Sequence, residues 1–277
     1  MKKVAVVLVL VVVAAAIGMQ GLMASSRDVS PAPIVHPGST YGTASDRSLH
    51  STRLAAPPGI DGDLTDWPAG ESINLNRDTA YSFSGRVTGT DDVLAIVRSG
   101  WDQNNLYFAI HVVDDILVTD STDVWRDDGV EIGIDGLRDW YAWGFDDHQY
   151  SVVADGRTTD RALPTTDISS AVLTYGGGYD VEMAIPMSQL IPGTPISGTV
   201  MGFTVGLHDD DDGGNWDAYL IWEGTNTSST PEEYASLLFA DRPEDRLAEL
   251  EAKLERLEQQ VQQLLIILSE FEQLTPP

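Results

Sequence analysis

The sequence of 277 residues contains no cysteine. Disulfide bonds, thiol catalysis and metal sites with cysteine ligands are therefore excluded, and stability must come from a packed core. Basic residues are also scarce, since 16 Lys and Arg stand against 43 Asp and Glu, and most of the net charge of −27 lies within residues 57–240. Such an acidic surface repels phosphate backbones, so nucleic acid is excluded as a partner.

Signatures of common enzyme classes are missing as well. The chain has no GxSxG elbow, no HExxH motif, no P-loop and no dinucleotide-binding glycine motif between a strand and a helix. A glycosidase needs only two suitably placed carboxylates, but among so many acidic residues the sequence singles out no such pair. The five histidines show no close metal-ligand spacing. We interpret the chain as a protein that is not an enzyme.

The only long apolar run lies at the N-terminus. Two lysines precede the apolar residues 4–17, as in the charged and apolar regions of a secretory signal. The apolar stretch also extends to Met23, which gives roughly the 20 residues that span a bilayer. We predict that residues 1–24 form either a signal peptide or a membrane anchor. The protein is then secreted or located in the cell envelope.

Composition changes twice along the rest of the chain. Residues 25–56 are rich in Ser, Pro, Ala and Thr, which predicts an exposed, mobile linker. Residues 57–241 contain short apolar runs separated by Gly, Asp and Asn, which predict an all-β domain, an antiparallel β-sandwich resembling a jelly roll. The predicted strands are 93–98, 106–113, 129–134, 149–154, 171–175, 179–186, 201–208, 218–222 and 236–240.

Residues 242–277 differ in kind, because apolar residues recur there at alternating steps of three and four. This seam consists of Leu247, Leu250, Leu254, Leu257, Val261, Leu264, Leu268 and Phe271. A repeat over four heptads predicts a coiled-coil helix. Basic residues flank the seam opposite acidic residues of a parallel partner, as Lys253 does opposite Glu258, which favours a parallel homo-oligomer. The alternative is a single helix that folds back on the β domain, and the number of chains in an oligomer stays open.

An acidic turn follows the predicted strand 201–208. It reads Asp209-Asp210-Asp211-Asp212-Gly213-Gly214-Asn215, and several carboxylates in a glycine-rich turn suit Ca²⁺. We predict Asp209, Asp211 and Asp212 as its ligands. A solvated acidic loop is the alternative.

Tryptophan is abundant, with seven residues, several of them in predicted loops. A tryptophan ring can pack against the C–H face of a pyranose while carboxylates and amides bind its hydroxyls, although sandwiches also bury tryptophan. Trp67 and Trp101 lie in turns that lead into strands, and we predict both in the core. The other tryptophans are candidates for a sugar-binding cleft.

Four segments, taken in order, resemble the family 9 carbohydrate-binding module and the wider DOMON-like β-sandwich group. They are 60–67 (IDGDLTDW), 101–109 (WDQNNLYFA), 125–132 (WRDDGVEI) and 179–186 (YDVEMAIP). The resemblance covers residues 57–240 and implies a non-catalytic domain that binds carbohydrate. The family also contains Ca²⁺ sites, which supports the cation prediction for the acidic turn.

The resemblance further implies that a sugar is held between two tryptophans, with a carboxylate near the first and an amide near the second. Trp125, six residues before Glu131, matches the first half of this clamp. Asn215 and Trp216 are predicted as the second half, with Trp222 as the reserve.

An additional loop, 139–147, lies outside the family pattern. Its tryptophans, Trp140 and Trp143, either extend the sugar cleft or pack against it.

The wider group leaves two other functions open. Some members bind haem as electron-transfer subunits, and the residues available here as axial ligands are Met183, Met187, Met201, His111 and His208. Other members are scaffolds of cell-surface assemblies. A purely structural role predicts that the domain has no ligand-sized cleft and that Trp125 and Trp216 are both buried.

Overall fold

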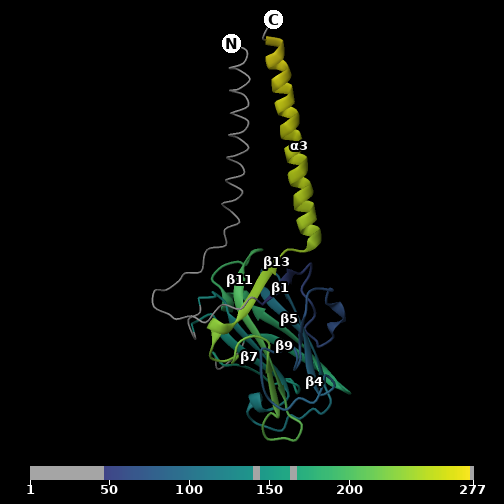
Figure 1. Cartoon of the computed structure of the whole chain (residues 1–277), viewed down its shortest axis with the longest axis vertical. Helices are drawn as coiled ribbons and strands as arrows, with labels where there is room; N and C mark the ends of the chain where they lie inside the picture. Colours follow the sequence, from purple (N-terminus) through teal and green to yellow (C-terminus); the bar gives the residue numbers. More distant parts are fainter. Residues whose placement is uncertain (1–46, 140–143, 163–166, 275–277) are drawn as a thin grey trace. The chain divides into compact units, whose positions relative to one another are not determined.

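The computed structural model describes residues 47–139, 144–162 and 167–274 (Figure 1). The chain divides into two units, a β domain that ends at Ala240 and a C-terminal helix. The predicted leader, residues 1–24, lies outside the described residues. Within the described ranges, no helix has both the length and the apolar composition needed to cross a membrane.

Thirteen strands of the described chain form one continuous, barrel-like sheet. All nine predicted strands are present: β4 (Val93–Trp101), β5 (Asn105–Asp114), β6 (Gly129–Asp135), β7 (Asp147–Val153), β9 (Ser169–Tyr175), β10 (Gly178–Pro186), β11 (Val200–Asp209), β12 (Ala218–Ile221) and β13 (Ala235–Ala240). Four further strands were not predicted: β1 (Ser48–Arg53), β2 (Ile73–Leu75), β3 (Ser82–Gly85) and β8 (Thr158–Asp160). The short helical segments are η1 (Leu64–Asp66), η2 (Val124–Arg126), α2 (Met187–Leu190) and η3 (Pro231–Glu233).

Strand β1 corrects the prediction that residues 25–56 form a linker throughout. It pairs in parallel with β13 on one side and with β4 on the other. It thereby joins two antiparallel halves, β8-β7-β6-β11-β13 and β4-β5-β10-β9, so the sheet is neither fully antiparallel nor divided in two. Only Leu49 and Ser51 are buried in β1. Backbone hydrogen bonds on both sides, which composition does not reveal, hold this strand.

The two halves of the sheet pack across one hydrophobic core. Phe108 of β5 stacks on Phe203 of β11 with ring centroids 5.3 Å apart, and Trp101 of β4 stacks on Phe239 of β13 at 5.1 Å. Such contacts between the halves arise because alternate residues of each strand point inward. Trp101 is 2% exposed and Trp67 is 7% exposed, so the prediction that both are core residues is confirmed.

A buried carboxylate explains why the first and last of the four motifs occur together. Glu182 of β10 is fully buried and accepts hydrogen bonds from the backbone N–H groups of Asp61 (2.9 Å) and Gly62 (2.7 Å) and from Trp67 Nε1 (2.6 Å). Gly62 has φ of 89° and lies so close to Leu173 of β9 that a Cβ atom would clash. Residues 60–67 are thus fixed against β9 and β10.

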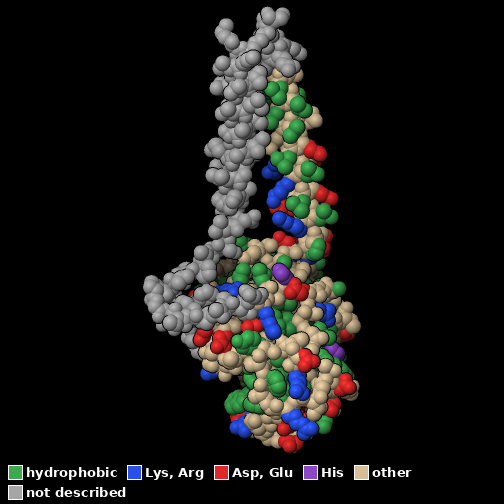
Figure 2. Space-filling model, viewed as in Figure 1, with side chains coloured by type: hydrophobic (Ala, Val, Ile, Leu, Met, Phe, Trp, Pro, Cys, Tyr) green, Lys and Arg blue, Asp and Glu red, His purple; other side chains and the backbone are tan. Residues whose placement is uncertain are grey.

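The C-terminal unit is the single helix α3 (Pro243–Leu274), as predicted for this part of residues 242–277. Its apolar seam is exposed, with side chains 38% to 59% accessible from Leu247 to Leu268. Figure 2 shows hydrophobic side chains along the visible face of this helix. Such a stripe is unfavourable in water unless a partner covers it.

Candidate functional site

A cavity of about 690 Å³ opens on the β domain, within the size range of small-ligand sites. Its walls come from η2, from β6, β7, β8, β11 and β12, and from the segment 225–228. The lining residue Glu131 lies between Val130 and Ile132 of the core, and His208 follows the core residue Leu207. Because successive side chains of a strand point to opposite faces, the cavity lies on the side of the sheet away from the core.

The structure brings together three of the predicted site residues. Trp125, on η2, is 48% exposed at the cavity, and Trp216, in the loop between β11 and β12, is half-buried at the same cavity. Glu131 lies in its buried wall. Trp125 and Trp216 are separated by about 90 residues in the sequence, so the paired strands β6, β11 and β12 bring them to one site.

Protein donors saturate the carboxylate of Glu131. Its Oε2 accepts hydrogen bonds from Tyr219 (2.8 Å) and Thr227, and its Oε1 accepts one from Ser151 (3.3 Å). Nε2 of His208 lies 3.4 Å from Oε1, close enough for an ion pair. Burial alone would raise the pKa of Glu131, but the attraction of His208 and these hydrogen bonds outweigh it and lower the pKa to about 2. Glu131 is therefore an ionised, internally satisfied group.

An aromatic stack extends from this carboxylate to Trp216. His208 stacks on Tyr219 at 4.2 Å between ring centroids, and Trp216 lies 6.4 Å from His208 and 6.1 Å from Tyr219. Gly206 of β11 makes room for the stack, because a Cβ atom there would lie 2.8 Å from the Tyr219 ring. Nδ1 of His208 is buried without a hydrogen-bond partner.

The other predicted site residues lie elsewhere. Asn215 is exposed, and its side chain donates to the backbone oxygen of Trp216 at 3.3 Å. It does not line the cavity, where Asn226 supplies an amide instead. Trp222 is 7% exposed and packs in the core against Phe203, at 5.7 Å between ring centroids. Trp140 and Trp143 lie outside the described residues.

The residues considered as haem ligands are not gathered at one site. Met183, Met187 and Met201 belong to the hydrophobic core, whereas His208 lies in the cavity wall on the opposite face. His111 is partly exposed, and its Nδ1 pairs with Asp180 at 2.7 Å.

Several cavity residues were not predicted from the sequence. They are Gln149, Ser151, Arg161, Tyr219, Asn226 and Thr227. Gln149 and Ser151 alternate with core residues of β7, as Glu131 does on β6. Polar residues that alternate with apolar ones on several strands were therefore a usable signal, but the strand order that makes them neighbours is not visible in the sequence.

On the core side of the sheet lies a second polar site, a cluster of Asp114, Asp128 and Asp209 with oxygens within 4.8 Å of one another. Each of these residues prolongs the inward-facing apolar row of its strand, as Asp209 does after Val205 and Leu207 of β11. Both oxygens of Asp209, Oδ2 of Asp114 and the hydroxyl of Tyr179 are buried without hydrogen-bond partners.

Burial and mutual repulsion raise the pKa values of this carboxylate cluster. Burial and the charge of Asp128 raise the pKa of Asp114 to about 9, and burial and Asp211 raise that of Asp209 to about 8. Burial raises the pKa of Asp128 to about 7, although backbone hydrogen bonds from Val118 and Asp210 oppose it. For all three groups to be ionised together at this position, a positive partner is needed.

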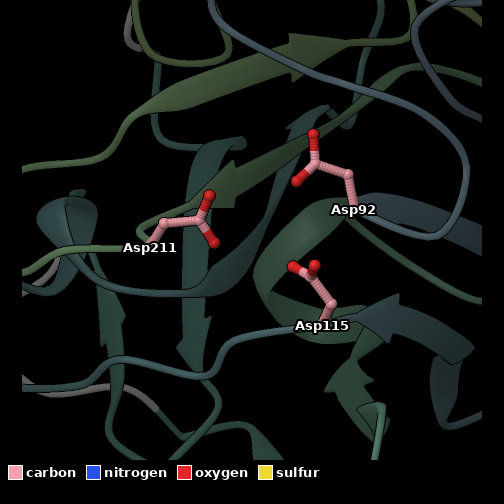
Figure 3. A group of neighbouring side chains, drawn as sticks. All are labelled: Asp92, Asp115 and Asp211. Carbon is pink, nitrogen blue, oxygen red and sulfur yellow. The ribbon is translucent and has the colours of Figure 1, made fainter.

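A second acidic group adjoins this cluster. Asp92, Asp115 and Asp211 point toward one another in Figure 3, with oxygens within 4.8 Å. Of the three ligands predicted from the sequence, Asp209 and Asp211 therefore belong to two neighbouring groups. Asp212 is exposed and lies apart, grouped with Asp210 and Asp217.

Known proteins share this domain. Residues 60–239 match the family described as carbohydrate family 9 binding domain-like. The chain is 27% identical over 70% of its length to the exoglucanase XynX of Acetivibrio thermocellus, and 31% identical over 53% of its length to the endo-1,4-beta-xylanase A of Thermoanaerobacterium saccharolyticum. It spans only 17% and 12% of those two proteins.

A solved structure has the same fold. It is a family 9 carbohydrate-binding module from Caldicellulosiruptor kristjanssonii, solved in complex with cellotriose and with glucose. For the cellotriose complex the TM-score is 0.62 at 24% identity, and the match covers 71% of this chain and 95% of that module. With the family match extending from Ile60 to Phe239, this chain belongs to the carbohydrate family 9 binding domain-like family.

Proposed function

We propose that this protein is an exported, non-catalytic carbohydrate-binding protein that holds a sugar between Trp125 and Trp216. The observation that carries the proposal is that both rings, from distant loops, line one cavity of about 690 Å³. A purely structural role predicted no such cleft and two buried rings, whereas Trp125 is 48% exposed. The observed cavity therefore favours ligand binding.

The chemistry of the cavity suits a neutral sugar. Tryptophan rings pack against the C–H faces of a pyranose, and the polar side chains around them bind hydroxyls. Glu131 contributes indirectly in this proposal, because its oxygens already accept hydrogen bonds from Tyr219, Thr227 and Ser151. The groups that reach the sugar in this proposal are then Gln149, Asn226 and Arg161 of the lining.

Calorimetric titration tests this function, with glucose and cellotriose as the first ligands because the similar module was solved with both. We expect Trp125→Ala and Trp216→Ala each to weaken cellotriose binding by about 10-fold or more, which corresponds to about 1.4 kcal/mol or more for each ring. Tyr81→Ala is the matched control, since Tyr81 is 58% exposed and does not line the cavity. No heat with a broad glycan panel, or unchanged affinity in both tryptophan variants, would refute the proposal.

We propose that α3 joins several chains into a parallel homo-oligomer. Its seam offers eight regularly spaced apolar residues, and self-association is the simplest way to cover them. Parallel pairing would let weak sugar sites act together on a polymeric glycan through a raised effective concentration. Removing residues 243–277 should yield monomers that bind cellotriose with unchanged affinity but are no longer retained on an insoluble polysaccharide. A monomeric full-length mature chain in light scattering at micromolar concentration would contradict this assembly.

We also propose Ca²⁺ as the partner of the carboxylate cluster, since buried carboxylates without hydrogen-bond donors suit a hard cation.

Secretion or attachment to the cell envelope through residues 1–24 is proposed from their signal-like sequence. N-terminal sequencing of the protein purified from its native host would test it. A cleaved chain that begins between residues 17 and 25 indicates a signal peptide, an intact leader in the membrane fraction indicates an anchor, and an intact soluble chain in the cytoplasm contradicts export.

A further inference from the structure

The cavity and the carboxylate cluster share strand β11 and the chain at β6, which they use from opposite faces. On β11, His208 faces the cavity while the next residue, Asp209, faces the cluster. On the chain that leads into β6, Asp128 belongs to the cluster and Glu131, three residues later, lines the cavity. The two sites are therefore separated by one layer of backbone.

The two loops that carry the tryptophans are also bonded to one another through the cluster. We define the tryptophan loops as residues 115–128, which contain Trp125, and 210–217, which contain Trp216. Oδ1 of Asp128 accepts a hydrogen bond from the backbone N–H of Asp210 at 2.7 Å, and Oδ2 accepts one from Val118 at 2.5 Å. One carboxylate of the cluster thus holds the bases of both loops.

Other contacts between the tryptophan loops are weaker. The backbone N–H of Gly214 donates to Asp120 at 3.3 Å, and Arg126 reaches the backbone oxygen of Gly214 at 3.4 Å. These long, exposed bonds hold the loops less firmly than the short, buried bond from Asp210 to Asp128. The cluster is therefore the principal junction of the two loops.

Asp128 lies next to buried carboxylate oxygens that have no hydrogen-bond partner. Both oxygens of the fully buried Asp209 and Oδ2 of Asp114 have no hydrogen-bond donor, and repulsion among the three carboxylates opposes a close approach of their backbones. A divalent cation would replace this repulsion by attraction and draw β5, the start of β6 and the end of β11 together. The donor set, several carboxylate oxygens with the hydroxyl of Tyr179 nearby, fits such an ion.

We propose that a divalent cation in the carboxylate cluster and a sugar in the cavity bind cooperatively, because the cation fixes the two tryptophan loops in the arrangement that the sugar contacts. The inference rests on the proposed sugar site. Linkage is reciprocal, so the cation raises the affinity for the sugar by the same factor by which the sugar raises the affinity for the cation. Couplings through a shared structural element are commonly about 5- to 150-fold, and we expect a factor of about 10 here.

Titration of the full mature chain with cellotriose, in excess Ca²⁺ and after chelation, tests the coupling. We expect cellotriose binding to be about 10-fold weaker after chelation, and Ca²⁺ binding to be strengthened to the same extent by saturating cellotriose. Asp209→Asn should abolish the difference, because it replaces a charged cation ligand by a neutral side chain of nearly the same shape. The Asp209 carboxylate makes no hydrogen bond in the structure, so the substitution breaks none. Asp91→Asn, at an exposed position outside the cluster, is the matched control.

Hydrogen exchange separates this coupling from a cation that merely stabilises the fold. We expect Ca²⁺ to protect backbone amides in both tryptophan loops, 115–128 and 210–217, and Asp209→Asn to remove that protection. Equal cellotriose affinity with and without Ca²⁺, together with a melting temperature that still rises, would overturn the coupling alone. Absence of any cellotriose or glucose binding in both conditions would instead overturn the proposed function, and the coupling with it.

Discussion

Two buried carboxylates on neighbouring strands, Glu131 and Asp209, are in opposite electrostatic situations. Glu131 has donors on both oxygens and lies beside His208, and its pKa is lowered to about 2. Asp209 has no donor on either oxygen and lies among other carboxylates, and its pKa is raised to about 8. The comparison teaches that one polar site is complete within the protein, whereas the carboxyl groups of the other lack hydrogen-bond partners and ionise only at higher pH.

The largest effect is expected where the complete network is broken. Glu131→Gln removes the charge that pairs with buried His208, and loss of one partner of a buried pair costs about 3–5 kcal/mol. The melting temperature should fall by about 6–20 °C, at about 2–4 °C per kcal/mol for a domain of this size. Glu71→Gln is the control, because Glu71 forms an exposed pair with His50. Equal melting temperatures for the two variants would show that the Glu131 network is not structurally important.

The incomplete site should respond to Ca²⁺ rather than to a change in hydrogen bonding. At a concentration of about 100 times its dissociation constant, a bound cation stabilises the folded state by about 2.7 kcal/mol. That corresponds to a rise of about 5–11 °C in the melting temperature. Asp209→Asn should lose most of this rise and Asp91→Asn none of it. A melting curve that is identical with chelator and with excess Ca²⁺ would show that the cluster binds no Ca²⁺.

A pH series sharpens the comparison, because the two sites predict opposite slopes. The lowered pKa of Glu131 contributes stability above about pH 4.5, which is lost as the pH falls toward 2. The raised pKa values of Asp114, Asp128 and Asp209 mean that the folded chain without a cation keeps protons that the unfolded chain releases above about pH 4. Stability should therefore fall between about pH 5 and pH 9 in chelator.

Thermal melts at several pH values, with and without Ca²⁺, measure these slopes. In excess Ca²⁺ the carboxylates are deprotonated in the folded state too, so the loss of stability above pH 5 should largely disappear. Parallel curves in the two conditions would contradict a cation at the cluster.

The smallest effect on stability is expected at the rim of the cavity. Trp125 is 48% exposed, so Trp125→Ala should change the free energy of unfolding by about 0.5 kcal/mol or less, in spite of the expected loss of sugar affinity. Urea unfolding of the variant and the wild type would test this separation. A loss of several kcal/mol would mean that Trp125 supports the fold. Weaker sugar binding by Trp125→Ala would then no longer indicate a direct contact with the sugar.

The sequence predicted most of the fold, since all nine predicted strands are present in the structure. It failed for β1, in which Leu49 is the only buried apolar residue and parallel pairing decides the position. β2, β3 and β8 have three or four residues each and are too short to show a period. β2 was missed although its Ile73 and Leu75 are core residues, because three residues are too few to establish alternation.

The candidate site was predicted only in part. Motif spacing pointed to Trp125 and Glu131, and a late loop to Trp216, and these three line one cavity. Asn215, predicted from the same late loop, and Trp222, the reserve, lie elsewhere. Asp114 and Asp128 were missed because they lie at strand ends, far in sequence from the acidic turn. Their grouping with Asp209 depends on which strands are neighbours, and that is a property of the whole sheet.

The central claim is that the cavity between the loop tryptophans is the sugar site. Its most direct test is an NMR titration of the protein with ¹⁵N-labelled tryptophan side chains, using cellotriose in the presence of Ca²⁺. We predict that the indole signals of Trp125 and Trp216 shift, while those of Trp67 and Trp101, buried in the core, stay in place. If saturating cellotriose shifts neither the Trp125 nor the Trp216 indole signal, or shifts only the signals of other tryptophans, the account is contradicted.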